Sequence, residues 1–298
     1  MIYDRIAANK RNSIILFIGF FLFNIFLGWI FGEILGLGYF GIFIAFFIAL
    51  IMIFSAYYKS DSLVLSISKA KPVSEKEYPH LYNSVEGLSI AAGIPKPKLF
   101  MIDDTAINAF ATGRDPEHAI IVVTKGAVQR LNRLELEGVI GHEMSHIKNY
   151  DIRFMMLVTV LVGTAALLSN IILHSFLWGG GRGGSRRGGG GITIAFIVLG
   201  LILAILTPFI AQIIRFSISR KREFLADADG ALLTRYPKGL ADALRKISTD
   251  QEPLEVANEA TENLYISNPF KKKHKSWFKG MFNTHPPVEE RIKALDGM

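Results

Sequence analysis

The chain has 298 residues, of which half are hydrophobic and one fifth are charged, and its formal net charge is +7. This apolar share is high for a water-soluble protein of such length, so a membrane protein is the first expectation. Cysteine is absent, which excludes disulfide frameworks, thiolate metal sites and cysteine nucleophiles.

Two uncharged runs begin the chain, at residues 14–31 and 34–58. Each comes close to or exceeds the length of about 20 residues that a helix needs to cross a bilayer. Gly32, Glu33, Gly36 and Gly38 lie between the two runs or at the start of the second and suit a very short turn, so residues 1–58 are predicted to form an N-terminal transmembrane hairpin. A cleaved signal peptide is the weaker alternative, because the apolar core of a signal is shorter and no small-residue cleavage pattern ends the first run.

Residues 59–153 have the pattern of the first half of a soluble domain. Strand-like apolar runs occur at 98–102, 107–112 and 119–124, and helical periodicity returns from about residue 133. The domain is therefore expected to combine a small sheet with helices.

A second pair of uncharged runs, at 154–178 and 192–214, flanks a Gly/Arg-rich linker at 179–191. Residues 154–218 are predicted to form a second transmembrane hairpin, because buried core helices are usually shorter and more amphipathic. A buried core hairpin is the alternative. Residues 219–298 would then supply the second half of the soluble domain.

The lysines and arginines indicate the orientation of the chain. Thirty of the 33 lie in residues 1–13, 59–153 and 215–298. Positive residues favour the cytoplasmic side, so these segments are expected there and the linker outside, although it carries the other three. Basic residues beside membrane segments also account for the positive net charge, and no nucleic-acid partner is expected.

Two histidines four residues apart, His142 and His146, are the main indication of chemistry. On a helix they share one face, and two imidazoles so placed can bind one tetrahedral zinc ion. Glu143 directly follows the first histidine, so it can reach the metal-bound water, whose pKa falls toward about 7, and take its proton. The alternative is a chance match, with both histidines as ordinary surface or core side chains.

Catalytic zinc usually has three protein ligands and an open position, so one more ligand is required. No third histidine follows within a turn of the helix, which indicates a carboxylate on a later helix. Glu223 and Asp227 lie one helical turn apart, so Glu223 could act as the ligand and Asp227 as the partner that orients a ligand imidazole, that of His142. A solvated helix face that pairs with the basic residues at 220–222 is an almost equally good interpretation. Three acidic residues on or just beyond the histidine helix suit a ligand role less well: Glu135, Glu137 and Asp151.

Residues 108–112 form a predicted strand of mostly small residues, whose edge could pair with an extended substrate backbone. Asn108, Ala109 and Phe110 are therefore candidate substrate-binding residues, although a plain core strand is the simpler interpretation.

Further on, His285 precedes two prolines that restrict the backbone, so its side chain could stabilise an oxyanion. A turn that starts a helix is the simpler interpretation there.

Four ordered motifs accompany the two apolar hairpins, at residues 108–111, 142–146, 222–227 and 285–287. Over nearly the whole chain they resemble the HtpX family of membrane-bound zinc metalloproteases, which is related to the CAAX prenyl protease. The resemblance implies an α+β fold class, with a mainly α-helical, zincin-like metalloprotease domain and a small β-sheet. It further implies four transmembrane helices in two hairpins, although the linker is long for this family.

The resemblance also implies roles for individual residues. It assigns three zinc ligands and one catalytic base, in that order: His142, His146, Glu223 and Glu143. Asn108, His285 and Arg291 would hold the substrate and the transition state. The protein would be a multi-pass protein of the bacterial inner membrane with its active site facing the cytoplasm, and it would cleave misfolded or damaged membrane proteins in quality control.

Two other functions are compatible with the same ligands. An intramembrane protease would carry the histidine pair, but Glu135, Lys148 and Asp151 are costly at bilayer depth, so the site is expected at the membrane surface. A non-catalytic membrane metal-binding scaffold or carrier would keep the ligands without turnover. A transporter would place ionisable ligands within its spans, where this chain has only His174 and amides.

Overall fold

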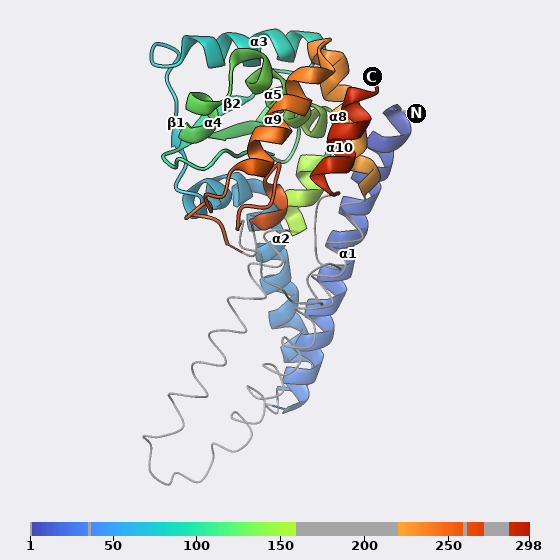
Figure 1. The fold of residues 1–298 in the computed structure, drawn as a ribbon. Helices are drawn as coiled ribbons and strands as arrows, with labels where there is room; N and C mark the ends of the chain where they lie inside the picture. Colours follow the sequence, from blue (N-terminus) through green and yellow to red (C-terminus); the bar gives the residue numbers. More distant parts are fainter. Residues whose placement is uncertain (1, 35–36, 159–219, 259–260, 271–285) are drawn as a thin grey trace. The chain divides into compact units, whose positions relative to one another are not determined.

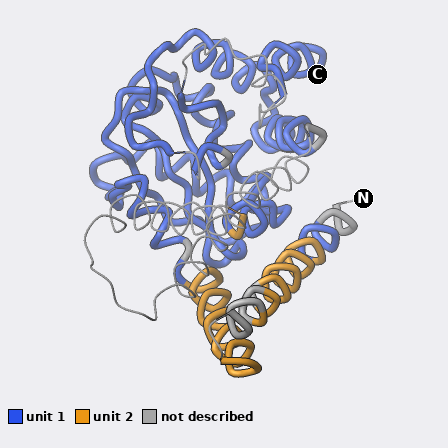
Figure 2. Tube along the Cα trace, turned by 90° about the horizontal axis from the view of Figure 1, so that it is seen from below, with its two compact units in different colours: residues 1–10, 59–156, 215–298 blue, residues 11–58, 157–214 orange. Residues whose placement is uncertain are grey.

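The structure is a computed structural model that describes residues 2–34, 37–158, 220–258, 261–270 and 286–298. It divides into two compact units (Figure 2). Unit 1 comprises Met1–Lys10, Lys59–Met156 and Arg215–Met298, and unit 2 comprises Arg11–Tyr58 and Leu157–Ile214. The expected combination of many helices with a small sheet is confirmed for the described residues.

In unit 2 the described residues form two long apolar helices. They belong to α1 (Ile2–Ile34) and α2 (Phe40–Ile67), which contain candidate membrane spans at Ile6–Phe23 and Phe40–Lys59. Large apolar side chains on these helices are mostly exposed, and Phe43 is 61 % exposed. A core helix of a soluble protein would bury them, so the two helices suit a lipid environment.

The turn between these helices lies at the last of the glycines that the sequence offers for it. α1 remains helical through Ile34, so Gly32 and Glu33 belong to the helix. The chain turns instead around Gly38, whose φ of 51° is left-handed and therefore favours glycine. Of the second predicted hairpin, only residues 154–158 lie within the described residues, and they are helical.

Unit 1 contains a four-stranded sheet in the order β1-β2-β4-β3. The strands are β1 (Lys71–Pro72), β2 (Lys98–Ile102), β3 (Ala109–Thr112) and β4 (Ile120–Thr124). β4 pairs in parallel with β2 and antiparallel with β3, which places β3 at one edge. Asn108 directly precedes this edge strand rather than lying in it.

Six described helices and two short 3₁₀ helices accompany the sheet in unit 1. They are α3 (Pro79–Ala92), η1 (Pro116–His118), α4 (Lys125–Arg130), α5 (Arg133–Lys148), α8 (Arg220–Thr234), α9 (Pro237–Thr249), η2 (Glu262–Leu264) and α10 (Val288–Asp296). α5 is the central helix, because it contacts α3, α8, α9 and the edge strand β3 (Figure 1). The histidine pair lies on this helix and is therefore enclosed from several sides.

The start of α5 is determined by its own sequence. Asn132 and Glu135 form a capping box, in which each side chain accepts a hydrogen bond from the other residue's backbone N–H. The carboxylate of Glu135 also accepts a hydrogen bond from Lys246 of α9 at 2.7 Å. These bonds fix where α5 begins and hence which of its residues face α8.

Two glycines allow α5 and α8 to approach closely. A Cβ atom added to Gly230 of α8 would lie 2.8 Å from the backbone N of His142 and 3.0 Å from the carbonyl carbon of Gly141. Such separations are too short for any side chain, so the backbones of the two helices are in direct contact at His142. This contact brings the carboxylates of α8 within reach of the histidines of α5.

We expect Gly230→Ala to destabilise the protein by about 1–3 kcal/mol, the usual range for overpacking, because the two helices must separate. Thermal unfolding of the purified protein in detergent measures the effect. Gly87→Ala is the matched control, because a Cβ there meets nothing within 4 Å and the site lies on the exposed face of α3. That substitution is expected to be neutral or to stabilise by up to about 1 kcal/mol. An equal response of both variants would contradict the close contact.

Candidate metal centre

Helix α5 presents two buried imidazoles toward one point. His142 and His146 are 1 % and 5 % exposed, and their Nε2 atoms lie 3.1 Å apart. The rings are nearly perpendicular, with centroids separated by 4.7 Å. The helical spacing of four residues therefore brings the two nitrogens together as the sequence predicts.

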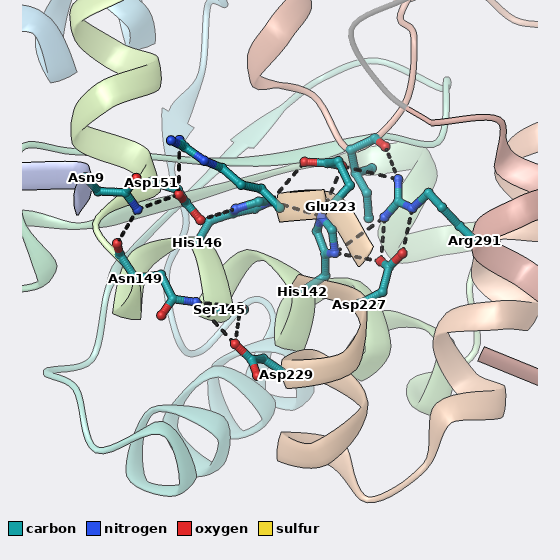
Figure 3. Close-up of polar contacts among 12 residues, drawn as sticks. Asn9, His142, Ser145, His146, Asn149, Asp151, Glu223, Asp227, Asp229 and Arg291 are labelled. Atoms are coloured by element: carbon teal, nitrogen blue, oxygen red, sulfur yellow. Dashed lines mark hydrogen bonds and ion pairs between the residues drawn. The ribbon is translucent and has the colours of Figure 1, made fainter. Parts of the chain in front are cut away.

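Helix α8 adds a carboxylate to this pair. Glu223 is fully buried, and its oxygens lie 3.5 Å from Nε2 of His146 and 3.9 Å from Nε2 of His142 (Figure 3). Tetrahedral zinc with bonds of about 2.0–2.1 Å separates its ligand atoms by about 3.3 Å. The three side chains offer two nitrogens and one oxygen at nearly this spacing, so their chemistry and geometry fit a zinc ion.

The alternative of a solvated face on α8 is wrong for both acidic residues. Asp227 is 1 % exposed, and its Oδ1 lies 2.9 Å from Nδ1 of His142. The negative charge of Asp227 is balanced by Arg291 of α10, which is itself 1 % exposed. Arg291 donates to both carboxylate oxygens of Asp227, at 2.8 and 2.7 Å. Asp227 can thus orient the imidazole of His142 while Arg291 holds Asp227.

Arg291 therefore lies in the interior of the site. Besides Asp227, its guanidinium approaches Glu223 at 3.5 Å and donates to the backbone oxygen of Ile266 at 3.1 Å. The charge of Arg291 lowers the pKa of Asp227 against the opposing effect of burial. Burial and the same charge lower the pKa of His142, which favours the neutral imidazole that a metal ligand requires.

The other imidazole has a different environment. Burial tends to lower the pKa of His146, but hydrogen bonding to Asp151 and the charge of Glu223 outweigh it and raise the pKa to about 9. The Nδ1 of His146 lies 3.1 Å from Oδ2 of Asp151. A proton and a metal ion consequently compete for the Nε2 of His146.

Glu143 lies beside the candidate ligands and is only 2 % exposed. Burial, reinforced by the charge of Glu223, raises its pKa to about 7. Its carboxyl group accepts a hydrogen bond from the backbone N–H of Ala111 in β3. The edge strand and the proposed base are therefore adjacent.

The residues predicted to bind substrate lie in different parts of the structure. Asn108, Ala109 and Phe110 are 1 % exposed and lie at or beside the edge of β3. Arg291 lies beside the carboxylates of Glu223 and Asp227 and contacts Asp227 directly. His285 lies outside the described residues.

Sequence reasoning missed two residues that the structure brings to His146. Asp151 had been considered only as a ligand, whereas it contacts the far nitrogen of the imidazole. Asn9, from the N-terminal helix, donates to Asp151 at 2.8 Å. The position of Asp151 just after the histidine helix was a usable signal, but nothing in the sequence pattern connects residue 9 with this site.

Comparisons with known proteins agree with the geometry. The family model described as Peptidase family M48 matches residues 75–298. A protein named Protease HtpX homolog from Dictyoglomus turgidum is 47 % identical over 294 residues, which cover 98 % of this chain and 93 % of that protein. A protein of the same name from Thermoanaerobacter pseudethanolicus is 42 % identical over 297 residues, covering 100 % and 98 % of the two chains.

Among solved structures, the crystal structure of S. mikatae Ste24p has a TM-score of 0.52 with this chain at 21 % identity. The match covers 99 % of this chain and 67 % of that one, and it shows a similar fold. The resemblance inferred from the sequence motifs is confirmed by the sequence relatives. This chain belongs to peptidase family M48 and is one of its HtpX-type membrane metalloproteases.

Proposed function

We propose that this metalloprotease is a zinc endopeptidase whose ligands are His142, His146 and Glu223. The observation that carries the proposal is the buried convergence of three ligand atoms within 4.8 Å of one another, with Glu143 beside them. Zinc bound there would polarise the scissile carbonyl and lower the pKa of the attacking water. The remaining steps depend on side chains of this chain.

Glu143 would act as the general base. A carboxyl group with a pKa of about 7 is partly ionised at neutral pH, and it can both accept and return a proton. Glu143 would take a proton from the attacking water and deliver it to the amine nitrogen that leaves. The hydrogen bond from Ala111 N–H fixes the carboxyl group toward the edge strand, where a substrate backbone would lie.

Asp227 would orient the ligand imidazole of His142, with Arg291 as its support. A carboxylate that accepts the Nδ1–H of His142 leaves Nε2 for the metal. Arg291 binds Asp227 through a two-pronged contact, and the same cation lies 3.5 Å from Glu223. The arginine thus stabilises the carboxylates of Glu223 and Asp227 together.

The substrate would be an extended peptide that pairs with the edge of β3 at Asn108, Ala109 and Phe110. His285 would stabilise the oxyanion that forms during attack. The two apolar helices support substrates drawn from membrane proteins, and the lysine and arginine distribution supports an active site on the cytoplasmic side of a multi-pass protein. Removal of misfolded membrane proteins in the bacterial inner membrane is the role that we propose.

A scaffold or carrier is a weaker explanation of the same ligands. Membership in a peptidase family favours an enzyme, and so does the buried Glu143, which a metal carrier would not require. A carboxylate at this place lowers the stability of a protein unless it is used or compensated.

We expect Glu143→Gln to lower peptide cleavage by about 10²- to 10⁴-fold, the usual contribution of a general base, and to leave the zinc content unchanged. A cleavage assay in detergent, with metal analysis of the same sample, measures both. Glu137→Gln is the control, because Glu137 lies on the same helix but pairs with Arg133 and Ser84. Full activity of the Glu143 variant would contradict the mechanism, and zinc without cleavage in the wild type would favour the carrier.

For Glu223→Gln, the expected result is a loss of zinc affinity larger than the roughly 10- to 100-fold typical of residues that only support a ligand. Competition with a chelator of known affinity measures it. Asp242→Asn removes a carboxylate from the surface pair with Arg245 and serves as the control. Unchanged affinity in the Glu223 variant would show that another group completes the site.

A further inference from the structure

The segment after α5 returns an acidic side chain to the imidazole of His146. Asn149 ends the helix, and Tyr150 has a φ of 60°, which is uncommon for a residue other than glycine. The chain becomes helical again directly after this left-handed residue, and Asp151 places its Oδ2 3.1 Å from Nδ1 of His146. The contact depends on a loop conformation that is unfavourable by itself.

The N-terminal end of α1 holds this loop. Asn9 is 4 % exposed, and its Nδ2 donates to the backbone oxygen of Asn149 and to Oδ1 of Asp151, both at 2.8 Å (Figure 3). The next residue, Lys10, places its Nζ 4.3 Å from the ring centroid of Tyr150. Two consecutive residues of α1 therefore contact all three residues of the loop, and all of these residues belong to unit 1.

These contacts determine the orientation of the Asp151 carboxylate relative to the imidazole of His146. The terminal torsion of an aspartate is broad, so one hydrogen bond does not fix its plane. Asn9 binds Oδ1, with Arg222 at 3.4 Å from the same oxygen, and Oδ2 is thereby directed at His146. A carboxylate fixed at Nδ1 keeps the proton there and leaves Nε2 directed toward Glu223.

We propose that Asn9 is a positioning residue of the metal centre, which acts on His146 through Asp151. The inference rests on the ligand role of His146 proposed above. Asn9 belongs to the first residues of α1, which lie in unit 1 with the rest of the site.

Binding of zinc and of cobalt to the full chain in detergent tests this proposal. We expect Asn9→Ala to weaken zinc binding by about 3- to 10-fold and Asp151→Ala by about 10- to 100-fold, as is usual for partners of ligand histidines. The visible absorption of bound Co²⁺ should change in both variants, because the ligand geometry changes. Asn12→Ala, on the same helix but outside the described contacts of Asp151, is the control.

A double-mutant cycle separates positioning from general stability. If Asn9 acts through Asp151, Asn9→Ala should have little further effect on zinc affinity once Asp151 is alanine. Additive losses, or an unchanged affinity and cobalt spectrum in Asn9→Ala, would overturn the inference. Failure of the wild type to bind either metal would instead overturn the proposed function.

A second, independent observation concerns the edge of β3. The residues proposed to bind substrate contact three consecutive residues of the same chain, Tyr265, Ile266 and Ser267, here termed the 265–267 segment. The backbone N–H of Ile266 donates to the oxygen of Ala109 at 3.0 Å. The side-chain amide of Asn108 donates to the oxygen of Ser267 at 3.2 Å.

Arg291 and Phe110 contact the same segment. Arg291 donates to the backbone oxygen of Ile266 at 3.1 Å. The ring of Phe110 packs edge to face against that of Tyr265, with centroids 5.1 Å apart. The three residues proposed to bind substrate, and Arg291 beside them, therefore contact the 265–267 segment.

The segment runs in the direction opposite to β3. Tyr265, Ile266 and Ser267 contact residues 110, 109 and 108 in turn, through one ring contact, one backbone hydrogen bond and one side-chain hydrogen bond. A peptide that pairs with the same groups cannot bind while the segment occupies them. We infer that the 265–267 segment is an internal pseudosubstrate that a substrate displaces, an inference that rests on the proposed function.

Peptide cleavage by Tyr265→Ala tests the pseudosubstrate. Loss of the contact with Phe110 should raise kcat/KM for a short unstructured peptide by about 2- to 10-fold, because an aromatic pair contributes a free energy of that size. Tyr236→Ala, at the half-exposed start of α9, is the control. Equal or slower cleavage by the Tyr265 variant with its zinc retained would identify the segment as a fixed wall and overturn the inference.

A synthetic peptide with the sequence of residues 262–268 provides a test without mutation. It should inhibit the wild-type protein competitively, raising KM while kcat is unchanged, and more strongly than a peptide of reversed sequence. Equal inhibition by the two peptides, or none, would overturn the inference. Absence of zinc-dependent cleavage in the wild type would instead contradict the proposed function.

Discussion

The backbone contact between α5 and α8 is the constraint on which the metal centre depends. Gly141 and Gly230 carry no side chains, so the two helices approach until a Cβ on Gly230 would lie within 3 Å of His142. At this separation Glu223 reaches the Nε2 atoms of both histidines, and Asp227 reaches the Nδ1 of one of them.

Because the carboxylates of this site are buried, its stability depends on electrostatic compensation as well as on packing. The carboxylates of Glu143, Glu223, Asp227 and Asp151 are each 5 % exposed or less. Charges buried at such depth lower stability unless opposite charges or hydrogen bonds compensate them. Arg291 compensates Asp227 and approaches Glu223, and a divalent cation between the histidines would complete the compensation.

The site also draws on distant parts of the chain. Asn9 comes from the first helix and Arg291 from the last, and each supports a carboxylate that contacts one of the two histidines. The two imidazoles are therefore oriented by separate supports, one from the N-terminal helix and one from the C-terminal helix. Proper geometry at the metal centre depends on the fold of the whole of unit 1 rather than on α5 alone.

The local sequence pattern was sufficient to predict several features of the structure. The spacing of His142 and His146 determined that they share a helix face, and the strand at 98–102 was predicted with its observed bounds. These features depend on residues close together in sequence, where helical and extended periodicities apply directly. The choice between Glu223 as a ligand and as a solvated residue could not be made in this way, because it depends on which face of α8 is covered.

The sequence by itself determined the class of chemistry: a histidine pair, an adjacent base and apolar helices of membrane length. Only the tertiary structure decided that Asn9 and Asp151 support His146, that Arg291 contacts Asp227 and approaches Glu223, and that residues 265–267 contact the edge of β3. The physical reason is that hydrogen bonds between distant residues leave no periodicity in the sequence, whereas helix faces and membrane spans do.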